Sequence, residues 1–201
     1  FIGCGMMGQE HLRNINLIND AMAYAIYEPN INMQKMAKKL APDAKFYDSL
    51  DKILSDENID CWLIVSPNHL HMDQLEQLAG IPHRPILVEK PLFTEIKHLE
   101  RIKNFSIKYS APVWVAMEYR YMPPIAELIK RQNSVTGGVK MLSIREHRFP
   151  FLPKVDDWNR FNKNSGGTFV EKCCHFFDLM RLVTRSNPTK IMASGCLLYT
   201  S

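Results

Sequence analysis

The stretch F-I-G-C-G-M-M-G at residues 1–8 decides the fold of this chain. Within it, the pattern G-x-G-x-x-G follows two apolar residues, which we interpret as the end of a strand. A helical pattern through Leu12, Ile15 and Ile18 comes after it. The first two glycines permit a tight turn and a close approach to the backbone, and the third lets helix and strand pack closely. A diphosphate would lie at the helix N-terminus, where unpaired N–H groups favour an anion.

A carboxylate supports this interpretation of the glycines. Glu28 follows the apolar run at residues 22–27 and lies 20 residues after Gly8, where it can accept hydrogen bonds from the ribose hydroxyls of an adenosine. A carboxylate there repels a 2′-phosphate, and Pro29-Asn30 offers no arginine to bind one. The sequence therefore favours NAD over NADP, and the alternative is a glycine turn beside a solvated Glu28.

Apolar runs and helical patterns alternate over the first 117 residues, which predicts a parallel sheet with crossover helices. Ile96, Leu99 and Ile102 should face the core from one of these helices. Strands are expected at residues 22–27, 61–65, 86–88 and 112–117, and helices at residues 33–40, 50–54, 70–78 and 94–110.

The rhythm changes near Glu118, where a second domain is expected to begin. Pro123-Pro124 should open a helix that runs to about Gln132, and the turn at residues 136–138 should lead into an extended segment at residues 139–149. The loop at residues 150–167 is rich in Pro, Asn, Asp and aromatic residues, which is typical of a binding loop. Both ends of the chain look cut, because the first strand has only two residues and the apolar segment at 191–199 has no closing cap.

Composition narrows the class of protein. The 201 residues are 46% hydrophobic and 23% charged, and the net charge of +4 comes from mixed basic and acidic residues, which argues against nucleic-acid binding. No apolar run approaches the roughly 18 residues of a membrane span, and no signal peptide opens the chain, so a cytoplasmic location without membrane partners is expected. The cysteines lack C-x-x-C spacing, so we expect buried, reduced thiols and no metal site.

Glu89-Lys90-Pro91 follows a predicted strand, at the edge where open α/β sheets bind their ligands. A lysine there can exchange a proton with a substrate hydroxyl. Taken alone, the tripeptide also fits a surface turn.

A second group of polar residues interrupts the apolar segment at residues 165–178. Glu171 and His175 are four residues apart and His175 and Asp178 three apart, so each pair would share one helical face. The alternative is a structural histidine that anchors this helix.

Taken together, these residues resemble the superfamily of glucose-fructose oxidoreductase, inositol dehydrogenase and MocA-like proteins, and the similarity covers essentially the whole chain. It rests on the glycine motif, the turn S-P-N-H-L-H at residues 66–71, Glu89-Lys90-Pro91, Arg120 with Pro123, and the segment that ends at Asp178.

The resemblance implies a Rossmann doubly wound parallel sheet in residues 1–117 and the start of a C-terminal α/β open-sheet domain, incomplete, in residues 118–201. It implies that Lys90 and His175 are the acid/base pair, that Glu171 stands where many members have aspartate, and that Asp178 supports the segment. Asn68 and Glu89 would contact the nicotinamide ribose, and His71 would shape that pocket. The expected cofactor-binding residues are Gly3, Gly5, Met6, Met7, Gly8, Glu28, Ser66, Asn68, His71, Glu89, Lys90, Arg120, Trp158 and Arg160.

The chain departs from the family pattern just before His175. Lys172-Cys173-Cys174 replaces the small residues of many members, and Lys172 adds a cation that would bind a substrate group or pair with Glu171. Substrate contacts are therefore expected from Lys90, Lys172 and His175. The Trp158-Asn159-Arg160 segment resembles a loop that approaches the nicotinamide.

The expected activity is hydride transfer between NAD and a secondary alcohol of a sugar, polyol or dihydrodiol. The partner is then a small-molecule substrate, in a parent protein expected to be a homo-oligomer. Two alternatives from other classes remain at this point, a redox-initiated glycosidase that uses bound NAD and a non-catalytic dinucleotide-binding sensor. Lys90 and His175 argue against the sensor.

Overall fold

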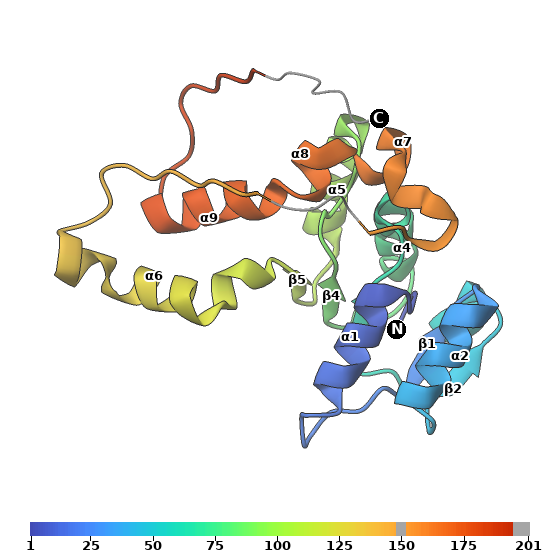
Figure 1. Ribbon diagram of the computed structural model, residues 1–201. Helices are drawn as coiled ribbons and strands as arrows, with labels where there is room; N and C mark the ends of the chain where they lie inside the picture. The colour runs from blue at the N-terminus through green and yellow to red at the C-terminus, as the bar shows by residue number, and fades with distance from the viewer. Residues whose placement is uncertain (148–151, 195–201) are drawn as a thin grey trace.

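A parallel sheet forms the centre of the molecule (Figure 1). The computed structural model describes residues 1–147 and 152–194. Two groups of strands are paired: β1 pairs with β2, and β4 pairs with both β3 and β5. All of these pairs are parallel. The strands are β1 (Ala25–Tyr27), β2 (Lys45–Tyr47), β3 (Trp62–Ile64), β4 (Ile86–Val88) and β5 (Val113–Val115).

Residues 1–2 connect the two groups of strands. Ile2 bridges to Tyr27 of β1 on one side and to Ile64 of β3 on the other. Its N–H donates to the Leu63 carbonyl at 2.8 Å, and its own carbonyl accepts from the Val65 N–H at 2.9 Å. The order is thus β2, β1, residues 1–2, β3, β4, β5, with the switch in strand order beside the glycine turn.

Helices cover both faces of this sheet, as in a doubly wound fold. Side-chain caps begin two of them: Asn30 accepts hydrogen bonds from the N–H groups of Asn32 and Met33, and Ser49 accepts one from the N–H of Lys52. The helices are α1 (Met6–Ile15), α2 (Ile31–Leu40), α3 (Leu50–Leu54), α4 (His71–Leu78) and α5 (Leu99–Lys108), with 3-10 turns η1 (Asn68–Leu70) and η2 (Ile96–His98).

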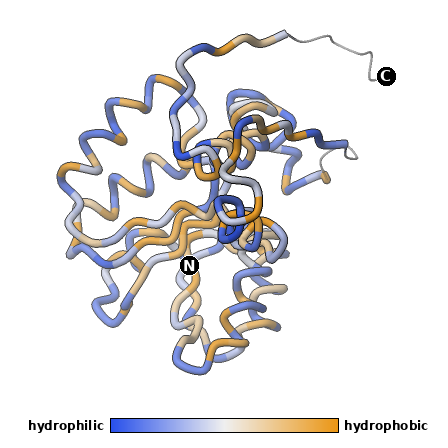
Figure 2. The backbone as a smooth tube through the Cα atoms, turned by 90° about the vertical axis from the view of Figure 1, so that its left-hand side faces the viewer, coloured by the Kyte–Doolittle hydropathy of each residue, from blue (hydrophilic) through white to orange (hydrophobic). Residues whose placement is uncertain are grey.

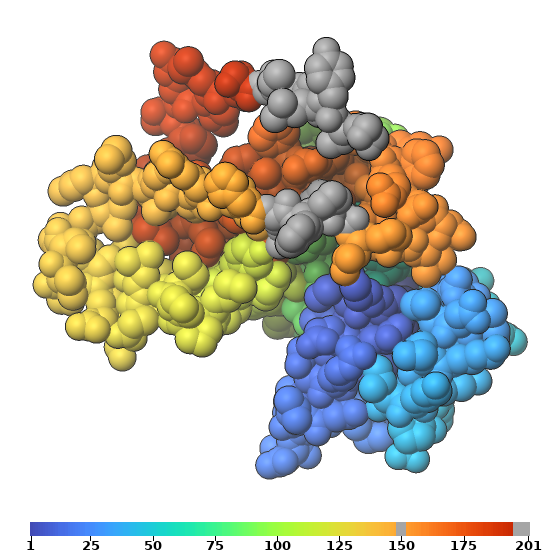
Figure 3. Space-filling view, in the orientation of Figure 1, coloured from blue at the N-terminus to red at the C-terminus, as the bar shows by residue number. Residues whose placement is uncertain are grey.

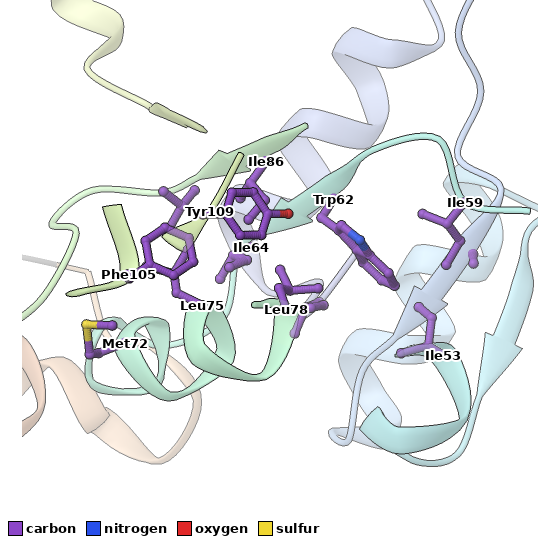
Figure 4. Packing of buried hydrophobic residues seen from close by; sticks show 13 residues of the cluster. Ile53, Ile59, Trp62, Ile64, Met72, Leu75, Leu78, Ile86, Phe105 and Tyr109 are labelled. Atoms are coloured by element: carbon purple, nitrogen blue, oxygen red, sulfur yellow. The ribbon is translucent and has the colours of Figure 1, made fainter. Parts of the chain in front are cut away.

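Two apolar cores lie on opposite faces of the sheet. Successive residues at the end of β3 pack into different cores, Ile64 into one and Val65 into the other. In Figure 2, the orange, apolar residues are concentrated in the middle of the molecule, where the strands lie. The core under α1 and α2 includes Leu12, Ile26 and Ala37. The core under α3, α4 and α5, shown in Figure 4, includes Ile53, Trp62, Leu75, Phe105 and Tyr109.

The region after Met117 consists of helices and turns in its described part. The segment at residues 139–147 forms no strand, since no neighbouring strand among the described residues completes its hydrogen bonds; residues 148 and 149 lie outside the described part. The elements are η3 (Glu118–Tyr121), α6 (Pro123–Thr136), η4 (Val155–Arg160), α7 (Asn162–Ser165), α8 (Gly167–Glu171) and α9 (Cys174–Thr184).

Several element boundaries differ from the sequence prediction. The strand expected at residues 22–27 is confined to Ala25–Tyr27, and α1 ends at Ile15, which leaves Ile18 54% exposed. Strand β2 was not predicted, because it begins with the exposed Lys45 and has no apolar run. Helix α6 continues past Gln132 to Thr136, where Gly137 ends it at φ +68°.

The register of α5 also differs from the prediction. The helix begins only at Leu99, after the 3-10 turn η2, and this turn leaves Ile96 82% exposed and Leu99 exposed as well. Ile102 packs on the core as predicted, together with Phe105. Because a 3-10 turn has three residues per turn, the buried face of the helix after it is shifted by about one residue from the position that a 3.6-residue period predicts.

None of the helices in residues 1–147 and 152–194 has the length and apolar character needed to cross a membrane. Cys4, Cys61, Cys173 and Cys174 are free thiols, but the expectation that the thiols are buried holds for Cys4 and fails for the exposed Cys61; Cys196 lies outside the described residues. Burial raises the pKa of the Cys4 thiol to about 12, so this thiol is an inert part of the core.

Gly3 offers a test of the turn that fixes this topology. Its φ is +88°, and a Cβ there would lie 2.7 Å from the backbone of Ser66. We expect Gly3→Ala to lower the free energy of unfolding by about 2 kcal/mol or more, measured by urea unfolding with circular dichroism. Gly5→Ala is the control, because Gly5 has φ −66° and open space around its Cβ position. Equal stability of the two variants would contradict the close approach at Gly3.

Candidate functional site

A cleft of about 980 Å³ lies at the carboxyl ends of β1, β3 and β4. The glycine turn forms one wall, and the segment at residues 153–158 from the second region forms another. In Figure 3 the orange atoms of that later segment abut the blue N-terminal part. Ten of the predicted cofactor-binding residues line the cleft: Gly3, Gly5, Met6, Met7, Glu28, Ser66, Asn68, Glu89, Lys90 and Trp158.

The three glycines of the turn serve different purposes. Gly3 lets the chain pass against Ser66, and Gly5 lines the cleft with nothing within 4 Å of its Cβ position. Gly8 faces away from the cleft: a Cβ there would lie 3.2 Å from the Gly3 carbonyl oxygen and 3.3 Å from Val65. Gly8 therefore serves the packing of α1 on the sheet and does not line the ligand space.

Glu28 follows β1 and ties the glycine turn to that strand. Its Oε2 accepts a hydrogen bond from the Cys4 N–H at 2.5 Å, and its Oε1 accepts one from the Asn30 N–H at 2.8 Å. A carboxylate has about four acceptor positions, so two bonds leave capacity for ligand hydroxyls on the cleft side. The residue predicted to bind ribose thus also holds the turn in shape.

The segment at residues 66–71 brings three different groups to the end of β3. Ser66 donates a hydrogen bond from Oγ to Gln74 at 2.6 Å, and Asn68 is buried beside the cleft. The Asn68 Nδ2 has no hydrogen-bond partner among the described residues, so this donor is available to a ligand. The ring of His69 contacts Trp158 edge-on at 6.2 Å, which joins this segment to the far wall of the cleft.

His71, which was expected to help shape the ligand pocket, does not itself line the cleft. It is fully buried, with Nδ1 2.8 Å from the Pro91 carbonyl oxygen and Nε2 3.0 Å from the Ser66 carbonyl oxygen. Burial lowers its pKa, although the two carbonyls oppose this. His71 thus connects the end of β3 to the end of β4 from behind.

Glu89 has a partner that the sequence interpretation missed. His11 Nε2 on α1 lies 2.7 Å from Glu89 Oε1. Burial raises the pKa of Glu89, but the hydrogen bond and charge of His11 and the charge of Lys90 outweigh it, so the pKa lies below its usual value. A signal was present, since His11 shares the i, i+3, i+4, i+7 stripe of Gly8, Leu12 and Ile15 and so falls on the buried face of α1.

Lys90 reaches from the end of β4 to the second region. Its Nζ donates to the backbone carbonyl of Glu171 at 3.2 Å, and the residue lines the cleft. The carboxylate of Glu171 points to another lysine, with its Oε1 3.6 Å from Lys154 Nζ. Burial lowers the pKa of Lys154, and the charge of Glu171 opposes this shift. Lys154 was not singled out from the sequence, where nothing marks it among the other loop residues.

His175 lies close to this cluster but behind the cleft wall. It is 2% exposed, its ring stacks on Tyr119 at 4.2 Å, and its Nε2 lies 3.4 Å from Glu118 Oε1. Burial, followed by the charges of Lys90 and Lys172, lowers its pKa to about 4. Lys90 and His175 therefore influence each other electrostatically, while Lys90 alone of the pair lines the cleft.

The predicted single helical face for Glu171 and His175 is wrong. Helix α8 ends at Glu171 and α9 begins at Cys174, so a break separates the two side chains. The two side chains have different partners: Glu171 lies near Lys154, and His175 stacks on Tyr119.

Three further predicted residues lie outside the cleft lining. Lys172 does not pair with Glu171: its Nζ contacts the Tyr119 hydroxyl and lies 3.5 Å from Glu146 Oε1. Arg120 binds both carboxylate oxygens of Asp178, which supports α9 as predicted for Asp178 but takes Arg120 away from the ligand space. Arg160 is exposed and pairs with Asp157 at 3.3 Å.

Comparison with known families agrees with this geometry. The fold and cleft define a dinucleotide-binding Rossmann protein. Residues 1–117 match the model described as "Oxidoreductase family, NAD-binding Rossmann fold", and residues 128–195 match "Oxidoreductase family, C-terminal alpha/beta domain". The chain belongs to this Gfo/Idh/MocA oxidoreductase family, which confirms the resemblance drawn from the motifs.

Individual relatives are inositol dehydrogenases. A myo-inositol 2-dehydrogenase from Thermotoga maritima is 26% identical over 199 residues, 98% of this chain and 58% of the relative. An inositol 2-dehydrogenase from Paracoccus denitrificans is 31% identical over 153 residues, 74% of this chain and 45% of the relative. The solved myo-inositol dehydrogenase from Lactobacillus casei, in complex with NAD(H) and myo-inositol, matches with TM-score 0.72 and 19% identity over 92% of this chain and 53% of that one. This chain spans about half the length of these relatives.

The low pKa of His175 predicts a pH-dependent stability. Because the folded state holds this ring neutral while the unfolded state takes up a proton near its ordinary value of 6.5, its contribution is complete above about pH 6.5 and is lost as the pH falls toward 4. We expect the difference in free energy of unfolding between wild type and His175→Gln to shrink from pH 7 to pH 4, as measured by urea unfolding. A constant difference would contradict the neutral buried ring.

Proposed function

We propose that this protein is an NAD-dependent oxidoreductase that transfers hydride between nicotinamide and a secondary alcohol of a sugar-like, polyol or dihydrodiol substrate. One observation carries the proposal: Lys90, at the carboxyl end of β4, lines the same cleft as the glycine turn and Glu28. A proton-transferring group and a dinucleotide-binding wall thus share one space. The inositol dehydrogenases among the relatives support a polyol substrate class.

The residues of the cleft fit the dinucleotide. The open space at Gly5 and the free N–H groups at the start of α1 suit a diphosphate, and Glu28 has acceptor capacity for the adenosine ribose. The unpaired Nδ2 of Asn68 suits the second ribose. Glu28 also disfavours a 2′-phosphate by repulsion, so we propose NAD and not NADP as the cofactor. Held by these residues, the nicotinamide would supply a hydride acceptor for the carbinol carbon, or a hydride donor in the reverse direction.

Lys90 is the proposed group that exchanges the hydroxyl proton. Its Nζ donates to the Glu171 carbonyl while the residue still lines the cleft, which holds Nζ at the junction of the two regions. During oxidation, the neutral amine form of Lys90 takes up the O–H proton of the substrate and becomes an ammonium as the carbonyl forms, and a general base in such a position contributes about 10²- to 10⁴-fold in rate.

His175 and Glu171 support Lys90 in this proposal. His175 is neutral at pH 7, because its pKa is about 4, so it adds no second positive charge beside Lys90 and retains a nitrogen that can accept a proton. Glu171 contributes through its backbone carbonyl to Lys90, and its carboxylate fixes Lys154 at the cleft wall. Substrate contacts of Lys172 would need its side chain to leave Tyr119.

Gly5→Val tests the dinucleotide wall. A valine side chain there meets no protein atom near its Cβ position and enters the space proposed for the diphosphate. We expect NAD affinity to fall at least about tenfold in calorimetry while thermal stability stays close to wild type. Unchanged affinity would place the diphosphate elsewhere. Gly80→Ala, at a glycine that has no left-handed φ and does not line the cleft, controls for the general effect of replacing a glycine.

Lys90→Met tests the proton-transfer role. We expect loss of about 10²-fold or more in turnover with polyols, sugars or dihydrodiols, read as NADH absorbance, with NAD affinity nearly unchanged. Lys97→Met is the control, because Lys97 is a surface lysine paired with Glu95. Full activity of Lys90→Met would refute the assignment. Sugar release without NADH accumulation would favour the glycosidase, and NAD binding without turnover of any substrate would favour the sensor.

A further inference from the structure

The tripeptide that carries Lys90 is held from two sides by histidines. On one side His11 Nε2 lies 2.7 Å from Glu89 Oε1, and on the other His71 Nδ1 lies 2.8 Å from the Pro91 carbonyl oxygen. The two contacts come from different helices, α1 and α4. Lys90 therefore sits between two fixed neighbours, whereas its own long side chain has only a single carbonyl as a hydrogen-bond partner among the described residues.

The His11 contact has a defined direction. A carboxylate only accepts hydrogen bonds, so the Nε2 of His11 carries the hydrogen and donates it in both the neutral and the protonated ring. The other oxygen of the carboxylate, Oε2, accepts from the Lys90 N–H at 3.2 Å. Both oxygens of Glu89 are thus engaged, one by α1 and one by the backbone that leads into Lys90.

Burial of both side chains increases the energetic cost of losing this contact. The side chain of Glu89 is 8% exposed and that of His11 19% exposed. A buried carboxylate that loses its donor keeps the cost of desolvation without compensation, so it either takes up a proton or turns toward another donor. Besides His11, the charged residue that lowers the pKa of this carboxyl is Lys90.

We propose that His11 is a positioning residue, which holds the Glu89 carboxylate and thereby fixes the end of β4 against α1. Helix α1 begins at the glycine turn, and β4 ends at Lys90, so this one contact joins the wall proposed for the diphosphate to the wall that carries the proton-transferring lysine. Without it, Glu89 is free to turn toward Lys90 and away from the cleft. The inference rests on the proposed function for its effect on turnover, but cofactor affinity tests it independently.

Three substitutions of His11 separate positioning from general structure. His11→Gln keeps an amide nitrogen at about the reach of Nε2, so we expect NAD affinity within about threefold of wild type. His11→Leu removes the donor, and His11→Asn is too short to reach Glu89. Both should weaken NAD binding roughly tenfold in calorimetry, with a similar loss in kcat/KM. Arg13→Leu, on the exposed side of the same helix, is the matched control and should bind NAD as wild type does.

A double-mutant cycle identifies the route of the effect. Glu89→Met removes the acceptor, and if His11 acts through Glu89, adding His11→Leu to Glu89→Met should cause no further loss of NAD affinity. If the double variant instead loses NAD affinity by the product of the two single losses, His11 acts by another route and the proposal is overturned. A uniform loss in His11→Gln, His11→Leu and His11→Asn would also overturn it, because it would reflect packing of the ring.

Folding and function remain distinguishable in this design. If His11→Leu fails to give a cooperative thermal transition, the polar His11→Asn decides the outcome, and NAD affinity of His11→Asn equal to that of wild type overturns the proposal. If wild-type protein binds NAD but oxidises no alcohol, the proposed function fails while the affinity series still tests His11. Full NAD affinity in both His11→Leu and His11→Asn would remove the positioning role altogether.

Discussion

The central position of residues 1–2 in the sheet is the constraint on which the rest of the structure depends. The backbone of Ile2 hydrogen-bonds to the β3 side, and Phe1 and Gly3 hydrogen-bond to Tyr27 of β1 on the other side, so the chain leaves the sheet after Gly3 and enters α1. This exit coincides with the switch in strand order, where neighbouring crossovers diverge and leave a crevice at the carboxyl ends of the strands. The ends of β1, β3 and β4 then deliver Glu28, Asn68 and Lys90 to one space.

Buried charges around this crevice are stabilised by specific partners. Glu89 has His11 and Glu171 has Lys154, while Glu28 accepts from two backbone N–H groups. A charge moved from water into the protein is costly unless such partners are present. These pairs are therefore as much a condition of the fold as the apolar cores, and they place ionised groups beside a ligand space without destabilising the protein.

Much of the fold and part of the site could be predicted from sequence. Hydrophobic runs located four of the five strands, and the glycine motif with Glu28 located the cleft, because these signals act over one element or one turn. The strand β2 and the exposed Ile96 were not predictable in this way, since β2 begins with an exposed lysine and has no apolar run, and a 3-10 turn changes the register. The position of His11 in the helical pattern indicated that it is buried, but nothing in the sequence indicated Glu89 as its partner.

The sequence alone determined the alternation of strands and helices, the glycine turn with its acidic partner, and the type of residue at positions 90 and 175, because residue chemistry and local spacing are written along the chain. Only the tertiary structure decided that His11 meets Glu89, that Glu171 meets Lys154 and not Lys172, and that Lys90 lines the cleft while His175 lies behind it. The physical reason is distance along the chain. Contacts between residues tens of positions apart depend on how whole elements pack, and a period within one helix or strand carries no record of them.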